Sequence, residues 1–155
     1  MIHYNQILPE LYVGTYPQDP MDIQLLKNRS RVTAVLNLQS DEDFEEREID
    51  WPALEAVYQN LSIEVRRVPM RDFDHDDQAE KLAEAVEVLA ALLDAGHTVY
   101  LHCNAGMGRS PLTAMAYLYW HRNISREDAI SYVKMRRPCF PYEDLLEAAL
   151  KDETT

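Results

Sequence analysis

The sequence predicts an α/β domain in which helices flank a mainly parallel sheet. Short apolar or β-branched runs alternate along the chain with longer segments that carry apolar residues at helical spacing. This alternation is typical of strand–helix–strand units. The length of 155 residues favours one domain that can bury its own core. No repeat, low-complexity tract or interdomain linker interrupts the pattern, so we expect a single domain over residues 1–155.

The first half of the chain supplies most of the predicted strands. Its predicted elements are, in order, two short strands in 6–14 about Pro9 and Glu10, a helix over 19–28, a strand over 32–38, an acidic loop or helical turn over 41–50, a helix over 52–60, and a strand over 62–70. The segment 32–38 is β-branched and apolar, which indicates a core strand.

The second half carries the clearest helix, over 78–95. Its apolar residues fall on one face, and Gly96 fits a C-terminal stop. The further predicted elements are a buried strand over 98–101, a helix over 111–122, a helix over 125–135 that opens with Ser125 and Asp128 as a capping box, and a last helix over 143–151.

Residues 102–110 lie between the predicted buried strand and the helix that Pro111 opens. Backbone N–H groups at a helix N-terminus have no partner within the helix and carry the positive end of its dipole, so an anion binds there. Glycines let the backbone curl so that successive N–H groups face one centre. Arg109 adds a permanently charged guanidinium that matches two phosphate oxygens. The sequence thus predicts a phosphate-binding loop made of His102, Asn104, Ala105, Gly106, Met107 and Gly108.

Cys103 stands at the start of this loop. Helix N-termini and nearby cations lower thiol pKa values from about 8.5 to roughly 3.5–7.5. We therefore expect a Cys103 thiolate that attacks a bound phosphoryl group in line. We also expect Ser110 to hydrogen-bond the departing sulfur and His102 to set the loop. The alternative is a buried core cysteine, but Cys, two glycines, Arg and Ser in this order form a specific pattern.

The loop resembles the signature loop of the cysteine-dependent phosphatases. Its portion from Cys103 to Arg109 is similar to a narrower branch, the glucan phosphatases, meaning laforin and the plant starch phosphatases. These dual-specificity-type phosphatases remove phosphate from glycogen or starch. The resemblance also covers residues 4–14, 35–43, 71–74 and 137–141. It implies a dual-specificity-phosphatase-like fold with a central sheet of about five strands. We expect no carbohydrate-binding module, so the catalytic domain itself would bind glycan.

Cleavage of a phosphate ester leaves an alkoxide, which needs a proton in the transition state. A loop carboxylic acid can donate this proton and then act as base for the hydrolytic water. On chemistry alone the candidates are Asp72, Asp74, Asp76 and Asp77. The resemblance favours Asp72, with Asp74 as the next candidate, and a solvated acidic loop is the better interpretation for Asp76 and Asp77.

Phe73 and Phe140 fall in loops rather than in periodic core segments. The resemblance implies that these positions form aromatic walls on which glucose rings pack, because sugar rings have apolar faces. Ordinary core or loop packing is the alternative. Tyr4, Trp51 and Tyr142 are weaker candidates for glucan binding.

One segment departs from the plant enzymes. Where these carry an aromatic pair, this chain has Glu46 and Arg47. Either one wall is missing or Trp51 replaces it.

The formal net charge of −12 opposes nucleic acid and anionic membranes as partners. It also disfavours an acidic phosphoprotein substrate relative to a neutral polymer with sparse phosphates.

The chain has no long apolar run and no signal pattern at its start. A thiolate nucleophile indicates a reducing, cytoplasmic compartment. Cys139 is expected to pack in the interior, with a reversible disulfide to Cys103 as the alternative. The histidines lack metal-ligand spacing, and the chemistry needs no metal or other cofactor.

We therefore interpret the chain as a phosphomonoesterase that forms a phosphocysteine and acts on phosphorylated α-glucan. A tyrosine or dual-specificity protein phosphatase is the alternative within the same reaction class. A non-catalytic phosphate or glycan reader has no need of a nucleophile. Rhodaneses and small arsenate reductases also use a cysteine in an anion loop, but the late position of Cys103 after an Asp loop fits them less well.

Overall fold

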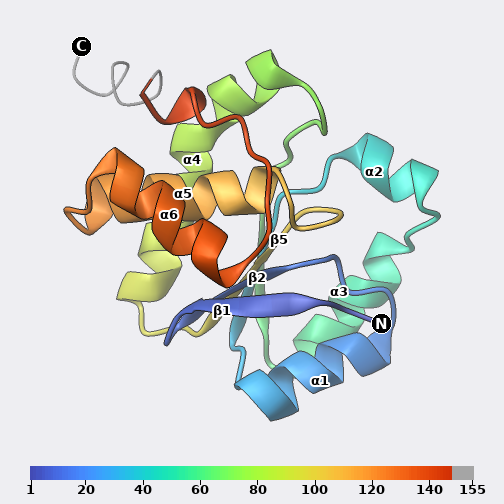
Figure 1. Cartoon of the computed structure of the whole chain (residues 1–155). Helices are drawn as coiled ribbons and strands as arrows, with labels where there is room; N and C mark the ends of the chain where they lie inside the picture. The colour runs from blue at the N-terminus through green and yellow to red at the C-terminus, as the bar shows by residue number, and fades with distance from the viewer. Residues whose placement is uncertain (148–155) are drawn as a thin grey trace.

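Short apolar strands form one five-stranded sheet in the order β1-β2-β5-β3-β4 at the centre of the computed structural model, which describes residues 1–147 (Figure 1). β1 (Tyr4–Leu8) pairs antiparallel with β2 (Leu11–Gly14). β2, β5 (Val99–His102), β3 (Ala34–Asn37) and β4 (Glu64–Arg67) run parallel. The predicted α/β fold with about five mainly parallel strands is confirmed.

Helices cover both faces of the sheet (Figure 1). They are α1 (Pro20–Ser30), α2 (Asp41–Glu46), α3 (Trp51–Asn60), α4 (His75–Asp94), α5 (Arg109–His121) and α6 (Arg126–Arg136). α4, α5 and α6 pack together on one face, where they bury the larger hydrophobic cluster, and α1 and α3 cover the other face over a smaller cluster. None of the helices in residues 1–147 has the length and apolar character needed to cross a membrane.

Most of these helices begin at a side-chain cap. The capping side chains, each of which accepts a hydrogen bond from the backbone N–H three residues on, belong to Asp19, Ser40, Asp50, Asp74 and Ser125. Such a cap contributes about 1 kcal/mol. α5 differs, because its N-cap residue is Gly108 and no side chain caps it. Its N-terminal N–H groups therefore stay available at the loop that carries Cys103.

The strands are shorter than the sequence predicts. β3 and β4 each have four residues in regular pairing. Beyond them, the backbone N–H groups of Leu38, Val68 and Met70 still donate to His102, Asn37 and Leu38, respectively. α4 starts three residues earlier than predicted, since Asp74 caps it. The acidic segment 41–50 contains the short helix α2. The predicted helix over 143–151 runs beyond the residues that the structure describes.

Candidate active site

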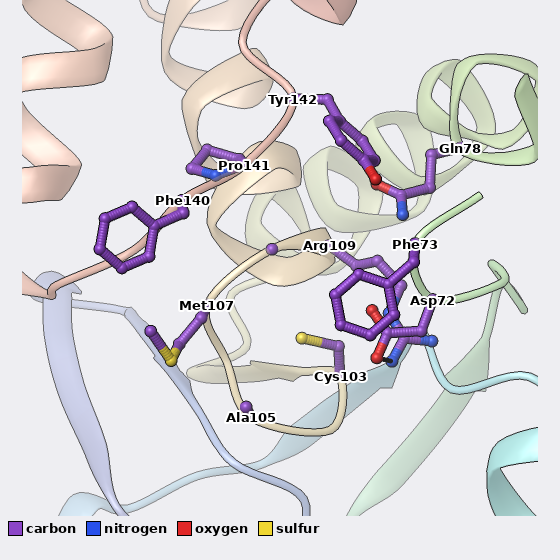
Figure 2. A pocket seen from close by; sticks show the side chains of 11 residues that line it. Asp72, Phe73, Gln78, Cys103, Ala105, Met107, Arg109, Phe140, Pro141 and Tyr142 are labelled. Atoms are coloured by element: carbon purple, nitrogen blue, oxygen red, sulfur yellow. Dashed lines mark ion pairs between the residues drawn. The ribbon is translucent and has the colours of Figure 1, made fainter. Parts of the chain in front are cut away.

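The loop after β5 wraps around a cavity of about 430 Å³ at the carboxyl ends of the parallel strands (Figure 2). The lining residues are Asp72, Phe73, Gln78, Cys103, Ala105, Met107, Gly108, Arg109, Phe140, Pro141 and Tyr142. The Cys103 Sγ lies 3.2 Å from the Ser110 Oγ, and both residues are buried. The hydroxyl is thus within hydrogen-bond distance of the sulfur, as a donor to a departing thiolate must be.

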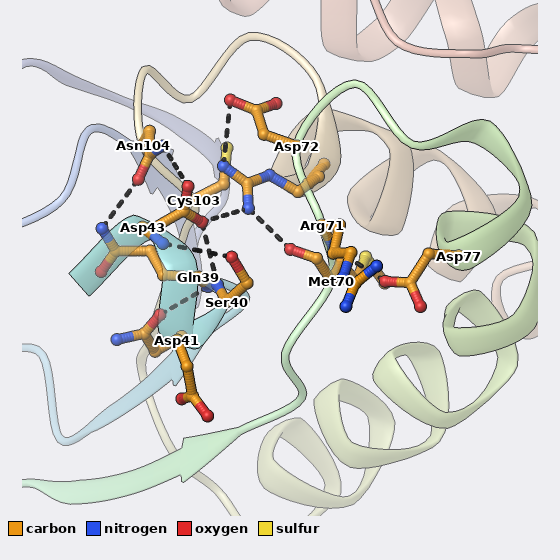
Figure 3. Close-up of polar contacts among 12 residues, drawn as sticks. Gln39, Ser40, Asp41, Asp43, Met70, Arg71, Asp72, Asp77, Cys103 and Asn104 are labelled. Atoms are coloured by element: carbon orange, nitrogen blue, oxygen red, sulfur yellow. Dashed lines mark hydrogen bonds and ion pairs between the residues drawn. The ribbon is translucent and has the colours of Figure 1, made fainter. Parts of the chain in front are cut away.

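Arg109 is fully buried at the floor of this cavity, at the first turn of α5. Its Nη1 donates to the Asp43 Oδ2 at 2.6 Å and to the Met70 carbonyl oxygen at 2.7 Å (Figure 3). Its Nη2 lies 3.3 Å from the Asp72 carboxylate. Neither Nη2 nor Nε has a hydrogen-bond acceptor among the described residues. A buried guanidinium with open donors on one edge matches a ligand with two oxygens, such as a phosphate.

Arg137 braces the loop from outside. Its Nε donates to the Gly106 carbonyl oxygen at 2.6 Å and its Nη2 to that of Ala105 at 3.0 Å, while its Nη1 reaches the Asn5 side chain at 2.9 Å. In a trans peptide the C=O and N–H point in opposite directions. Holding these carbonyls outward therefore turns the N–H groups of Gly106 and Met107 away from Arg137, as an anion-binding loop requires.

Gly106 is needed at this turn. It has a φ of +68°, and an added Cβ would lie 2.6 Å from the Arg137 Nη2 and from backbone atoms of Gly14. Only glycine combines this backbone conformation with so close an approach.

His102 is a buried neutral support of the loop. Its Nδ1 donates to the Cys103 carbonyl oxygen at 3.1 Å. Burial, aided by the positive charge of Arg109, lowers the pKa of His102 to about 4. The imidazole is therefore uncharged at neutral pH and acts through hydrogen bonding and packing.

Of the four acidic candidates, only Asp72 lines the cavity. Asp74 is the N-cap of α4 and accepts from the Asp77 N–H at 3.0 Å. Asp77 accepts from the Arg71 N–H at 2.8 Å, so it supports the loop backbone. Asp76 has a fully exposed side chain beside His75. Of these four residues, the structure thus places Asp72 alone in the cavity that Cys103 and Arg109 also line.

Phe73 and Phe140 flank the cavity and expose most of their side chains, 86% and 78% respectively (Figure 2). Phe73 has a φ of +58°, a conformation that costs a residue with a Cβ about 1–3 kcal/mol. Phe140 is fixed by its backbone N–H, which donates to the Met107 carbonyl oxygen at 2.7 Å. Both rings are thus held in solvent at the cavity, where core packing does not explain them. The Phe73 ring lies beside Cys103, whereas the Phe140 ring points away from it (Figure 2).

Tyr4 and Trp51 lie elsewhere. Both pack against the smaller hydrophobic cluster, and neither lines the cavity. The Tyr4 hydroxyl bonds the Ser30 hydroxyl at 2.7 Å, and the Trp51 ring stacks on Phe44 with centroids 5.3 Å apart. Glu46 and Arg47 line a second hollow of about 420 Å³ that also reaches Phe73 and Asp72.

Two charged residues that sequence reasoning missed support the loop: Asp43 and Arg137. The serine and aspartate at Ser40 and Asp43 have capping-box spacing, which could have indicated a helix start there. That spacing says nothing of the contact between Asp43 and Arg109, which joins positions 66 apart in the sequence. Cys103 and Cys139 are both buried free thiols.

Comparison with known proteins decides the family. The model of the family described as "Dual specificity phosphatase, catalytic domain" matches residues 11–152. The chain belongs to the dual-specificity phosphatase family. This membership makes it a cysteine-dependent phosphatase.

This dual-specificity phosphatase is 31% identical over 99% of its length to the amyloplastic phosphoglucan phosphatase DSP4 of Castanea sativa. It is 30% identical over 97% of its length to laforin of Mus musculus, and 30% over 90% to the chloroplastic phosphoglucan phosphatase LSF1 of Arabidopsis thaliana. The chain spans 41%, 49% and 24% of these relatives, respectively.

Solved structures share the fold of this dual-specificity phosphatase. A crystal structure of PTPMT1 matches with a TM-score of 0.76 and 20% identity over 98% of this chain and 94% of that one. The structure titled Tk-PTP in the active form matches with a TM-score of 0.73 and 23% identity, over 96% and 94% of the two chains.

Proposed function

We propose that this domain is a phosphomonoesterase that removes phosphate from phosphorylated α-glucan. The single observation that carries the substrate class is the pair of exposed rings, Phe73 and Phe140, beside the Cys103 loop. Aromatic faces bind the apolar faces of sugar rings without any need for charge. The similarity to phosphoglucan phosphatases supports the same class.

The reaction has two steps. In the first, the Cys103 thiolate attacks phosphorus, the P–O bond to the sugar breaks, and Asp72 protonates the leaving oxygen. Arg109 and the loop N–H groups bind the non-bridging oxygens as charge develops on them. The open Nη2 and Nε of Arg109 support this role.

In the second step water hydrolyses the phosphocysteine. The Asp72 carboxylate, now deprotonated, takes a proton from the water, which attacks phosphorus while the P–S bond breaks. The Ser110 hydroxyl donates a hydrogen bond to the departing sulfur, as the separation of 3.2 Å permits.

The test compares phosphate release from phosphorylated amylopectin or glycogen with hydrolysis of p-nitrophenyl phosphate. Wild type should act on both, and Cys103→Ser should lose both activities. The double variant Phe73→Ala/Phe140→Ala should lose phosphoglucan activity by about 10- to 100-fold, roughly the worth of two ring contacts of 0.5–1.5 kcal/mol each, and retain the small ester. Trp51→Ala, away from the cavity, is the matched aromatic control.

A wild type that cleaves only the small ester would remove the glucan assignment and leave the phosphatase chemistry intact. A protein phosphatase is then the next candidate, since the apolar rim would equally accept a phosphotyrosine ring. Phosphopeptide activity far above phosphoglucan activity would establish it.

A further inference from the structure

One edge of the Arg109 guanidinium is fixed by protein and the other is open. Both hydrogens of Nη1 are used, because this atom donates to the Asp43 carboxylate at 2.6 Å and to the Met70 carbonyl oxygen at 2.7 Å. The guanidinium is planar, so fixing Nη1 at two acceptors also fixes where Nε and Nη2 point. These two nitrogens make no hydrogen bond among the described residues, and Nη2 lies 3.3 Å from the carboxylate of Asp72, the acid of the proposed reaction.

Asp43 reaches this position because α2 begins beside the loop (Figure 3). Its backbone N–H donates to the Ser40 Oγ at 3.3 Å, and its Oδ2 accepts from the Ser40 N–H at 2.9 Å, which completes a capping box. Its Oδ1 accepts from the Asn104 side chain at 2.8 Å. The carboxylate, only 4% exposed, therefore joins the start of α2 to both ends of the phosphate loop.

We propose that Asp43 is a positioning residue, which aims the open edge of Arg109 at the bound phosphoryl group through the Nη1 contact. This inference rests on the phosphatase chemistry proposed above and adds a residue that does not touch substrate. Burial of a guanidinium requires an acceptor for each donor. Asp43 satisfies this requirement on one edge only and leaves the other edge to the ligand.

The choice of a carboxylate has a second consequence. Its negative charge lies against Arg109, so it offsets part of the positive field that acts on the bound anion. Substitution of Asp43 can separate the effect of its hydrogen-bond acceptor on Arg109 from the effect of its negative charge on anion binding. Asp43→Asn keeps an acceptor and removes the charge, whereas Asp43→Ala removes both.

An asparagine can be accommodated by the neighbouring amides. Gln39 Nε2 donates to the Asn104 Oδ1 at 2.8 Å, and Asn104 donates onward to Asp43. If the amides of Asn104 and Gln39 both turn over, the introduced amide NH₂ finds an acceptor and its oxygen still faces Arg109. Asp43→Asn therefore removes the charge while it keeps the contact that orients Arg109.

The experiment measures orthovanadate affinity by calorimetry and kcat/KM on p-nitrophenyl phosphate in the intact chain. Asp43→Ala should lose about 100-fold in both, the effect of a misplacement near 1 Å. Asp43→Asn should stay within about tenfold of wild type in both measurements. It keeps a hydrogen bond to Arg109 and loses only the strengthening that the carboxylate charge gives to this bond, roughly 1.4 kcal/mol. Glu45→Gln, an exposed change of the same charge on α2, is the control and should bind as wild type.

A second measurement separates kcat from KM for p-nitrophenyl phosphate. Because Arg109 binds the phosphoryl oxygens as charge develops on them, Asp43→Ala should lower kcat more than it raises KM, and Glu45→Gln should change neither. A folded Asp43→Ala with wild-type vanadate affinity would overturn the proposal. Equal losses in the Asn and Ala variants would also overturn it. If Asp43→Ala does not fold, the Asn variant decides: retained vanadate binding supports the proposal, and lost binding contradicts it. A chain without phosphoglucan activity that still shows this pattern would refute the glucan assignment alone.

Discussion

Asp72 and Asp74 lie two residues apart and make different contacts. Asp72 faces Arg109 in the cavity, and Asp74 holds the first turn of α4. Chemistry alone does not separate these carboxylates, because either is a competent acid. The two residues differ in role because α4 begins at Asp74, whose side chain is used to cap the backbone of this helix.

This difference predicts opposite phenotypes. Asp72→Asn should lower kcat about 100-fold or more on esters with poor leaving groups, as removal of a general acid does, and leave thermal unfolding nearly unchanged. Asp74→Ala should lose about 1 kcal/mol of stability, as loss of an N-cap does, and retain kcat. Steady-state kinetics and calorimetric melting of both variants check this, with exposed Asp76→Ala as control. Full activity of Asp72→Asn would show that another group donates the proton to the leaving oxygen.

Residue-scale prediction from sequence succeeds where the signal is local. Cys103, Arg109 and Ser110 are placed by one short loop between a strand and a helix, so their spacing alone brings them together. Asp43 and Arg137 reach the same loop from distant positions, and no local pattern encodes those contacts. Burial by itself raises the pKa of Asp43, but hydrogen bonds from Arg109, Ser40 and Asn104 together with the Arg109 charge outweigh it and lower that pKa overall.

At the scale of elements, the phosphate loop joins an uncapped helix to a strand end. Sequence periodicity predicts the long helices well, because burial of one apolar face dominates their energetics. It predicts strand ends less well, since β3 and β4 each pair over only part of the longer apolar runs 32–38 and 62–70. The short helix α2 has too few turns to show periodicity, and it is held by its cap and its contacts with the loop.

Within the loop the two glycines should respond differently to alanine. Gly106→Ala forces a Cβ into atoms of Gly14 and Arg137 at a positive φ, which should cost at least about 1–3 kcal/mol of unfolding free energy. Gly108 has a φ of −122°, and nothing lies within 4 Å of an added Cβ. Gly108→Ala should therefore unfold close to wild type in denaturant titrations. Similar stabilities for the two variants would contradict the role assigned to Gly106.

At the scale of the whole molecule, acidic and basic groups are unevenly balanced. The formal net charge is −12, yet the cavity floor carries Arg109 and α5 presents its positive end. The net charge of the protein acts on a substrate that approaches from a distance, whereas the positive phosphate loop acts on a phosphate already at the cavity. The composition predicts the long-range repulsion, and only the fold shows where the positive loop lies.

Salt should therefore favour polyanionic substrates. Raising ionic strength from 0.01 to 0.15 M shortens the Debye length from about 30 Å to about 8 Å, so long-range repulsion is screened. We expect kcat/KM for an acidic phosphopeptide to rise about two- to fivefold and that for a sparsely phosphorylated glucan to change less. Initial rates across this range, with a neutral phosphopeptide as control, test it. A falling rate for the acidic peptide would show that the positive loop governs approach.

The brace formed by Arg137 has a consequence for how the protein acquires its activity. It ties the loop at Ala105 and Gly106 to Asn5 at the start of the chain, and β2 pairs with β5 between Leu11 and Val99. Such long-range closures are slow steps of folding. We therefore expect the phosphate loop to be among the last parts to acquire its native shape, so that recovery of catalysis during refolding should report completion of these long-range contacts rather than of any one segment.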